Sequence, residues 1–280
     1  MTALVRFAGA DGAEAGTLDG DEVTPVGLPD EPWPATVARW HAAPHDVPAA
    51  GSPVPAASVR LLPPVGAGSR VFCVAQNYPA HAAEAGGASP PRPVVFLKPV
   101  EAFVGHGATA TLPASSSFFD YEGEIAVVIG EHGTALEPAR AADAIAGYTV
   151  ANDGSARDLQ PATLADRFQV DWFAAKCSDR ASALGPGVVP AAEVAPPESL
   201  WLRTWHNDEL VQDDVAASMY HSIPDVVSFV SRIVELRPGD VVLTGTPAGV
   251  GKARGVRLAP GDVVTVAAAG LGRLTTHYAH

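Results

Sequence analysis

Hydrophobic residues along this chain fall mostly into short runs, a pattern typical of β-strands rather than long helices. The runs are rich in valine, isoleucine and leucine, and they are bounded by Gly, Pro, Asp or Asn, which favour turns. Because few segments show helical spacing, we expect a mainly β protein of the α+β class. The predicted strands are residues 4–7, 71–75, 94–97, 124–129, 147–151, 200–206, 241–244 and 263–267.

Helical spacing is confined to a few segments. In residues 224–235, apolar residues recur three or four positions apart and therefore share one helix face. Residues 79–85 begin with a proline, which fits the first turn of a helix. Residues 36–41 are expected to form a further short helix. The apolar positions in the first segment are Val226, Val227, Val230 and Ile233.

The character of the sequence changes near residue 66. Residues 1–66 are rich in Ala, Pro and Gly, which predicts a small β-rich N-terminal domain followed by a linker. Residues 67–280 carry most of the strand pattern and are expected to form the main domain. Two Pro-Gly-Asp sequences, at 238–240 and 260–262, predict tight turns, because Pro fixes φ at the first corner and Gly accepts a positive φ at the second.

Charge and cysteine content narrow the classes of function. The 280 residues carry a formal net charge of −13, from 18 Lys and Arg against 31 Asp and Glu. Such an acidic surface repels phosphate backbones and anionic lipid headgroups, so we expect neither a nucleic acid nor a membrane as partner. Cys73 and Cys177 are too few and too far apart for a disulfide framework. With no signal peptide and no long apolar segment, the sequence predicts a cytoplasmic protein.

The strongest candidate for chemistry is a pair of carboxylates beside a buried strand. Glu122 and Glu124 precede or begin the apolar run that ends at residue 129, and residues two apart on a strand share a face. Hard oxygen ligands of this kind suit Mg²⁺, Mn²⁺ or Ca²⁺. An exposed acidic strand edge is the alternative interpretation.

A third carboxylate follows another predicted strand. Asp153 comes directly after residues 147–152 and is a candidate to complete a three-carboxylate site. If the following stretch forms a helical turn, Arg157 and Gln160 face one side and can hold a substrate carboxylate. Asp153 as a helix N-cap and Arg157 as a surface ion-pair partner explain the same residues equally well.

Further polar residues stand close to apolar ones. His81 and Glu84, three positions apart on the short helix predicted over 79–85, can form a dyad that deprotonates water, or an ordinary solvated contact. Lys98 and Lys176 lie beside apolar residues, where a lysine usually extends to the surface. Thr246 follows a predicted strand at what is either a ligand-contacting turn or an ordinary one.

Taken together and in order, several motifs resemble the fumarylacetoacetate hydrolase family from about residue 69 to the end. This resemblance implies a mixed β-sandwich roll as the catalytic domain, a small β-rich N-terminal domain, and a homodimer. The residues that carry it are Asn77-Tyr78 with His81 and Glu84, Phe96-Leu97-Lys98-Pro99, Asp120-Tyr121-Glu122-Gly123-Glu124, residues 147–160, Lys176, and residues 244–251 with the sequence Thr-Gly-Thr-Pro-Ala-Gly-Val-Gly.

The resemblance also implies roles. Glu122, Glu124 and Asp153 match the family's ligands for a divalent metal, Mg²⁺ or Mn²⁺, with Ca²⁺ as a substitute in crystals. His81 and Glu84 match its catalytic dyad, and Lys176 its catalytic lysine. The positions that match substrate contacts are Arg157, Gln160, Thr246 and Lys98.

The implied substrate is a small anionic 2-oxo or diketo acid. Hydrolysis of a C–C bond in an acylpyruvate or fumarylpyruvate, through a metal-bound enolate, is the leading hypothesis. Decarboxylation of an oxaloacetate-like 2-oxo acid, or isomerisation of a 2-hydroxydiene dioate, is the alternative within the family. A non-catalytic, metal-stabilised dimer that binds such a ligand is the alternative of another class.

Overall fold

The computed structural model describes residues 2–10, 12–27, 31–44, 46–164, 167–194 and 196–280. Most of its elements are strands, which confirms the predicted mainly β fold. A 12-stranded sheet has the order β4-β3-β2-β1-β16-β12-β11-β19-β6-β7, with β5 beside β1 and β8 beside β16. Its strands are β1 (Thr2–Ala8), β2 (Ala13–Asp19), β3 (Glu22–Val26), β4 (Val54–Pro55), β5 (Leu61–Leu62), β6 (Val71–Ala75), β7 (Val94–Lys98), β8 (Phe103–Val104), β11 (Gly123–Ile129), β12 (Ile145–Asn152), β16 (Ser182–Pro190) and β19 (Val241–Leu243).

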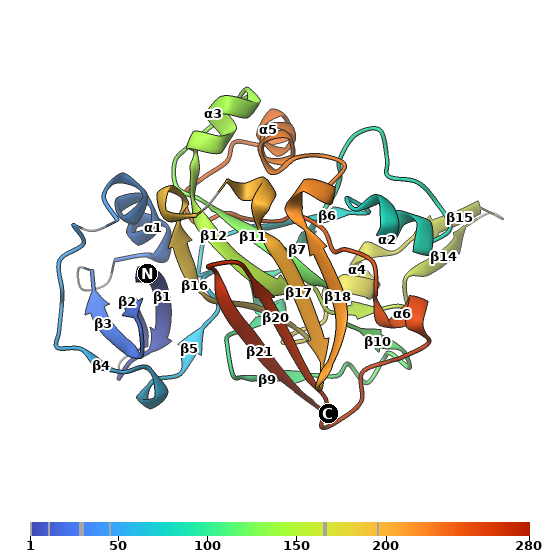
Figure 1. Cartoon of the computed structure of the whole chain (residues 1–280), viewed down its shortest axis with the longest axis horizontal. Coiled ribbons are helices and arrows are strands. Elements are labelled where there is room, and N and C mark those ends of the chain that lie inside the picture. The colour runs from blue at the N-terminus through green and yellow to red at the C-terminus, as the bar shows by residue number, and fades with distance from the viewer. Residues whose placement is uncertain (1, 11, 28–30, 45, 165–166, 195) are drawn as a thin grey trace.

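A second sheet, of five strands in the order β18-β17-β20-β21-β9, lies across one face of the first (Figure 1). Ile125 and Val127 of β11 belong to the same buried apolar cluster as Leu202 and Val264 of this sheet. The two sheets therefore pack face to face as a sandwich. The five strands are β9 (Thr109–Thr111), β17 (Trp201–His206), β18 (Glu209–Val215), β20 (Val263–Ala268) and β21 (Gly272–Ala279).

The opposite face of β11 is buried as well. Ala126 and Val128 belong to a second apolar cluster that includes Val37 and Trp40 of helix α1 (Trp33–Ala42). Burial on both faces explains why this strand is an uninterrupted apolar run in the sequence. Strand β1 pairs with β16, so the N-terminal segment shares both the large sheet and the core with the rest of the chain. The domain boundary at residue 66 stays a prediction.

The predicted helices are confirmed at α1, α2 (Pro79–Glu84) and α5 (Ile223–Ile233). In α5, Val226, Val227 and Val230 are buried, whereas Ile233 in the last turn is 72% exposed. The remaining helices are α3 (Pro138–Asp143), α4 (Trp172–Lys176) and α6 (Gly251–Arg254), with 3₁₀ turns η1 (Ala56–Ser58), η2 (Val100–Ala102), η3 (Ala191–Glu193), η4 (Pro197–Ser199) and η5 (Ala216–Ser218).

Both Pro-Gly-Asp sequences form the predicted turns. Gly239 and Gly261 have φ values of 81° and 94°. Asp240 N donates to Arg237 O at 3.0 Å, and Asp262 N donates to Ala259 O at 3.1 Å. Two small two-stranded antiparallel sheets complete the fold: β10 (Phe119–Asp120) with β13 (Ser155–Ala156), and β14 (Pro161–Leu164) with β15 (Arg167–Val170).

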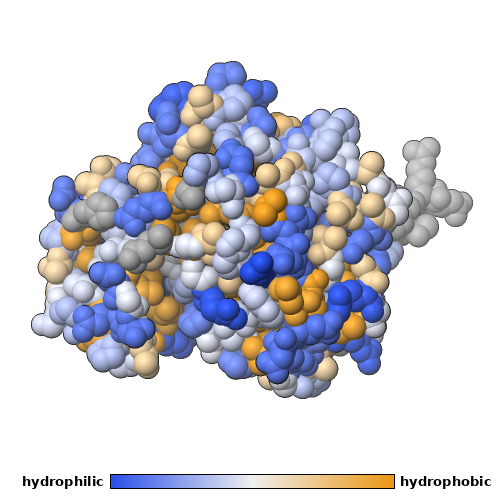
Figure 2. Space-filling view, in the orientation of Figure 1, coloured by the Kyte–Doolittle hydropathy of each residue, from blue (hydrophilic) through white to orange (hydrophobic). Residues whose placement is uncertain are grey.

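The molecular surface mixes hydrophilic and hydrophobic residues (Figure 2). On the face shown in Figure 2, hydrophobic residues lie in small groups among hydrophilic ones. Among the described residues, no helix is long and apolar enough to cross a membrane.

Candidate active site

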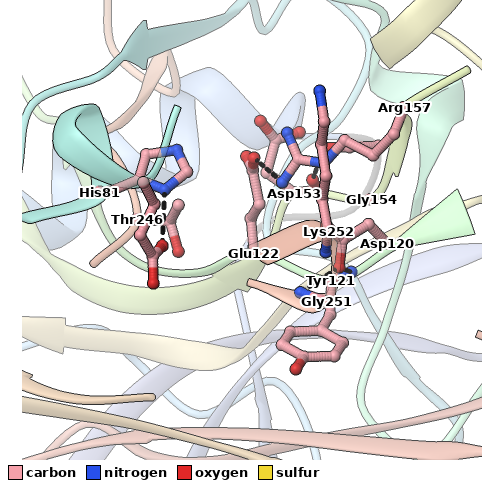
Figure 3. A network of polar contacts seen from close by, with 12 residues as sticks. His81, Asp120, Tyr121, Glu122, Asp153, Gly154, Arg157, Thr246, Gly251 and Lys252 are labelled. Carbon is pink, nitrogen blue, oxygen red and sulfur yellow. Dashed lines mark hydrogen bonds and ion pairs between the residues drawn. The ribbon is translucent and has the colours of Figure 1, made fainter. Parts of the chain in front are cut away.

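Three carboxylates gather at one end of the β11–β12 pair. The register pairs Gly123 with Asn152, which brings Glu122 opposite Asp153, and Asp153 N donates to Glu122 O at 2.8 Å. Glu124 lies two residues further along β11, on the same face as Glu122. All three side chains are buried, and one ligand oxygen from each lies within 4.8 Å of the others. Figure 3 shows Glu122 and Asp153 in this arrangement.

Two cations neutralise part of this charge. Lys176 Nζ lies 2.5 Å from Glu122 Oε2 and 2.6 Å from Asp153 Oδ2, and Arg157 Nη2 lies 2.6 Å from Glu122 Oε1. Burial disfavours the charge on Glu122, but Lys176 and Arg157 outweigh it and lower the pKa of Glu122. Burial likewise opposes the charge on Lys176, yet Asp153 and Glu122 raise the pKa of its ammonium group. Glu122 and Lys176 are therefore ionised at neutral pH.

Glu124 has the opposite balance. Burial, followed by repulsion from Asp153 and Glu122, raises its pKa well above the ordinary value. Gly245 N donates to Glu124 Oε2 at 2.6 Å, and only glycine fits there, because its φ is +98° and a Cβ would lie 2.9 Å from Asn77 Cβ. A divalent cation would relieve the repulsion at Glu124. The all-oxygen donor set fits Mg²⁺ or Mn²⁺.

Lys98 lies behind the carboxylate cluster. Its Nζ contacts Asp153 Oδ1 and donates to Gly154 O at 3.1 Å and Ser182 Oγ at 2.6 Å. The residue is 3% exposed, so the expectation that it extends to the surface is wrong. The same correction applies to Lys176, which is 4% exposed. Lys98 is placed to orient Asp153, whereas the predicted substrate contact would require it to reach past that residue.

Helix α2 brings His81 and Glu84 to the cavity. Asn77 Nδ2 fixes the start of this segment by donating to Thr244 O at 2.9 Å. His81 Nδ1 lies 3.6 Å from Glu84 Oε2, which is longer than a hydrogen bond, and Gly249 N holds the Glu84 carboxylate at 2.9 and 3.1 Å. Burial lowers the pKa of His81, so its imidazole is neutral at pH 7. A neutral, buried imidazole is able to accept a proton.

The segment after Asp153 is not the helical turn that we expected. Ser155–Ala156 pairs as strand β13 with β10, and the chain then turns, with Leu159 N donating to Ala156 O at 3.2 Å. Arg157 and Gln160 nevertheless both line the cavity. The Asp120 carboxylate fixes Arg157, whose Nε donates to Asp120 Oδ2 at 2.8 Å. The surface ion pair considered for Arg157 is ruled out because this residue is 7% exposed.

Thr246 also lines the cavity, but its hydroxyl already serves the scaffold. Its Oγ1 donates to Gly123 O at 2.8 Å and accepts from Gln212 Nε2 at 2.8 Å. The hydroxyl proton is thus used within the protein. Its remaining contribution to a ligand is limited to the acceptor side of the oxygen and to the backbone.

The carboxylates face a cavity of about 540 Å³, into which the predicted His81, Glu84, Arg157, Gln160, Lys176 and Thr246 also project. Local sequence did not reveal two further parts of its wall. Phe96 and Trp172 stack with ring centroids 4.6 Å apart, and Lys252 lines the cavity. The position of Lys252 directly after the 244–251 motif was the one available signal.

Comparison with known proteins decides the family. A sequence profile of the fumarylacetoacetate hydrolase C-terminal domain matches residues 70–278. The chain belongs to the fumarylacetoacetate hydrolase family. It is 39% identical over 271 residues to protein Rv2993c of Mycobacterium tuberculosis, covering 96% of this chain and 95% of that protein.

Two solved structures of this fumarylacetoacetate hydrolase family fold are informative. The 2-hydroxyhepta-2,4-diene-1,7-dioate isomerase of Mycobacterium marinum has a TM-score of 0.80 and 34% identity, over 99% of this chain and 98% of that one. The fumarylpyruvate hydrolase of Pseudomonas aeruginosa, in complex with Mn²⁺ and pyruvate, has a TM-score of 0.67 and 31% identity, over 78% and 91% of the chains. By name, both are enzymes that act on small organic acids.

Proposed function

We propose that this protein is a divalent-metal-dependent hydrolase that cleaves a C–C bond in an acylpyruvate-type diketo acid. The observation that carries the proposal is the placement of His81 in the same cavity as the Glu122, Glu124 and Asp153 cluster. A metal held by the carboxylates would supply an electrophilic centre, and His81 would supply a base; hydrolysis of such a bond needs both. The likeness to a fumarylpyruvate hydrolase holding Mn²⁺ and pyruvate supports the same assignment.

The metal would be held by the oxygens of Glu122, Glu124 and Asp153. When bound there, it would polarise the 2-oxo group and stabilise negative charge developing on that group. Lys176 is held by Glu122 and Asp153, so its ammonium adds positive charge at the same place. Arg157 offers its guanidinium to the substrate carboxylate while Asp120 fixes its orientation.

His81 would move the proton. Its Nδ1 faces Glu84 at 3.6 Å, so the other ring nitrogen, Nε2, would take a proton from water. The resulting hydroxide oxygen bonds to the acyl carbonyl carbon, the C–C bond breaks, and its electron pair passes to the departing 2-oxo acid as an enolate. Return of the proton from His81 to carbon completes the reaction, which yields a carboxylic acid and a 2-oxo acid.

Isomerisation of a 2-hydroxydiene dioate is the second candidate. The observation that favours it is the likeness to the Mycobacterium marinum isomerase over 99% of this chain, the N-terminal segment included. That reaction uses the same cluster and the same base but needs no water. Whichever activity is correct, the homodimer and the cytoplasmic location stay predictions.

A substrate panel separates the candidates. Purified protein with Mg²⁺ or Mn²⁺ is supplied separately with acetylpyruvate, fumarylpyruvate, oxaloacetate and a 2-hydroxydiene dioate, and the products are identified by mass spectrometry. We expect pyruvate and an acid from the acylpyruvates. Isomerised dioate without acylpyruvate cleavage would assign the second candidate, and pyruvate with CO₂ from oxaloacetate alone would assign decarboxylation.

Variants of the cluster test whether the chemistry belongs to this cavity. Glu122→Ala and Asp153→Ala are expected to abolish turnover. Asp143→Asn is the matched control, because Asp143 is exposed on α3 and pairs with Arg140 outside the cavity. Bound ligand without any turnover in the unmodified protein would favour the non-catalytic binding protein instead.

A further inference from the structure

Lys252 is a cation at the cavity that the proposed chemistry does not use. It is an exposed residue of the short helix α6, and it lines the same cavity as the carboxylate cluster. Among the residues that the structure describes, no carboxylate lies within ion-pair distance of its Nζ. By contrast, the neighbouring Arg254 is paired with Glu209. Lys252 is therefore available to a ligand.

The backbone of Lys252 is fixed, so its side chain starts from a defined place. Asp120, which is fully buried, accepts a hydrogen bond from Gly251 N at 2.7 Å and from Lys252 N at 3.0 Å. The same carboxylate holds Arg157 Nε at 2.8 Å. One buried anion thus presents two cations, Arg157 and Lys252, to the cavity. Figure 3 shows Asp120 close to Arg157, Gly251 and Lys252.

The two cations differ in what else they contact. Arg157 pairs with Glu122 of the cluster, so it lies where the reacting end of a 2-oxo acid would bind. Lys252 has no such pairing with the cluster, and its neighbours in the cavity wall include the small Ala253 and the apolar Val250. A ligand with one carboxylate needs only the Arg157 side of the cavity. An unpaired second cation is suited to a second carboxylate at the other end of the ligand.

We propose that Lys252 binds the distal carboxylate of the substrate, so that the protein selects dicarboxylic 2-oxo acids over monocarboxylic ones. This inference rests on the proposed function, because that function places the first carboxylate and the 2-oxo group at the cluster. The observation that carries it is that Lys252 lines the cavity without a carboxylate partner among the described residues, whereas Arg157 and Lys176 are already paired. The overall charge of −13 makes such a local cation more important for an anionic ligand.

The test is a binding measurement and needs no turnover. Two probes of equal chain length are compared by titration calorimetry with the Mn²⁺-loaded protein: 2-oxoadipate, which ends in a carboxylate, and 2-oxohexanoate, which ends in a methyl group. Matching pairs of five and seven carbons, each a 2-oxo dicarboxylate with its methyl-ended analogue, are tested as well. They cover different distances between the two carboxylate-binding positions. We expect the dicarboxylate of at least one pair to bind about tenfold more tightly than its methyl-ended partner.

Two variants locate the preference. Lys252→Met keeps an unbranched side chain that is one atom shorter and removes the charge. It should abolish the preference while leaving the affinity for 2-oxohexanoate unchanged. Arg254→Met is the matched control. It also removes one positive charge, two residues from Lys252, but the Arg254 side chain is paired with Glu209. It should leave the preference intact.

The outcomes distinguish this inference from the proposed function. Equal affinities within every pair, or a preference that survives in Lys252→Met, would overturn the role of Lys252 and leave the proposed function standing. Failure of all probes to bind to the metal-loaded protein would contradict the proposed function and the inference together. A preference lost only in Lys252→Met would support the inference even if the reaction is isomerisation.

Discussion

Asp120 and Arg157 form a buried ion pair at 2.8 Å that ties the cavity wall to the fold. Asp120 also accepts from the backbone N–H of Gly251 and Lys252, so one carboxylate orients two parts of the cavity wall that lie far apart in the sequence. Such a carboxylate positions other groups and need not touch the substrate. Its loss should therefore affect both stability and binding.

We expect Asp120→Asn to lower the free energy of unfolding by about 3 kcal/mol, because one partner of a buried pair is neutralised while the other stays charged. The Michaelis constant should rise more than kcat falls, since Arg157 would lose its orientation. Urea denaturation and steady-state kinetics measure the two effects. Asp143→Asn serves as the exposed reference, and a variant with unchanged stability and kinetics would remove Asp120 from this role.

The metal-free protein should gain stability when Glu124 is neutralised. Burial and its carboxylate neighbours raise the pKa of Glu124, so its ionised form costs folding free energy, and this cost grows as pH rises through the folded-state pKa. In the presence of a chelator, Glu124→Gln should therefore melt at a higher temperature than the unmodified protein at pH 8. The variant should also lose the further stabilisation given by Mn²⁺.

Thermal melts with and without Mn²⁺ check this prediction. Glu131→Gln is the control, because Glu131 pairs with Arg140 at the surface and lies beyond the other end of β11. A Glu124→Gln protein that melts lower in chelator, or that still responds fully to Mn²⁺, would argue that Glu124 is not a strained metal ligand.

The pH dependence of turnover should report His81. Burial lowers the pKa of this imidazole below 6.5, and a general base acts only when it is neutral. The value of kcat/KM should therefore be constant near neutral pH and fall as pH decreases through the folded-state pKa, below 6.5. His81→Gln should reduce hydrolysis by about 100-fold or more while Mn²⁺ affinity changes little.

Profiles of kcat/KM from pH 5 to 8, together with Mn²⁺ titrations of the variant, provide the measurement. If kcat/KM of His81→Gln still falls at acidic pH in the same way, the group that titrates is not His81. Full hydrolytic activity in that variant would exclude the imidazole as the base.

The three-carboxylate cluster could be predicted from the sequence because its geometry is local. The two-residue period of a strand places Glu122 and Glu124 on one face, and an acidic residue at the end of another strand suggested Asp153. The antiparallel register then brings Glu122 and Asp153 together. The dyad was visible for a similar reason, since the three-residue spacing of His81 and Glu84 fits a helix.

Lys98 shows where this reasoning fails. On β7 the hydrophobic Leu97 is 58% exposed and the charged Lys98 is 3% exposed, the reverse of what hydropathy predicts. The reason is that Asp153 and Ser182, which lie 55 and 84 residues away in sequence, supply the partners of the ammonium group. Long-range partners of this kind have no local signature. Strand β16 was missed because its Gly185-Pro186-Gly187 sequence is typical of a turn.

The central claim is that Glu122, Glu124 and Asp153 hold one divalent ion on which turnover of a 2-oxo acid depends. Its most direct test is a titration of Mn²⁺ into chelator-treated protein, with bound metal followed by electron paramagnetic resonance and acylpyruvate cleavage followed in the same samples. We expect one bound ion per chain, a rate that rises in proportion to occupancy, and loss of both in Asp153→Ala. Full turnover in the metal-free protein, or tight one-to-one binding retained in Asp153→Ala, would contradict the account.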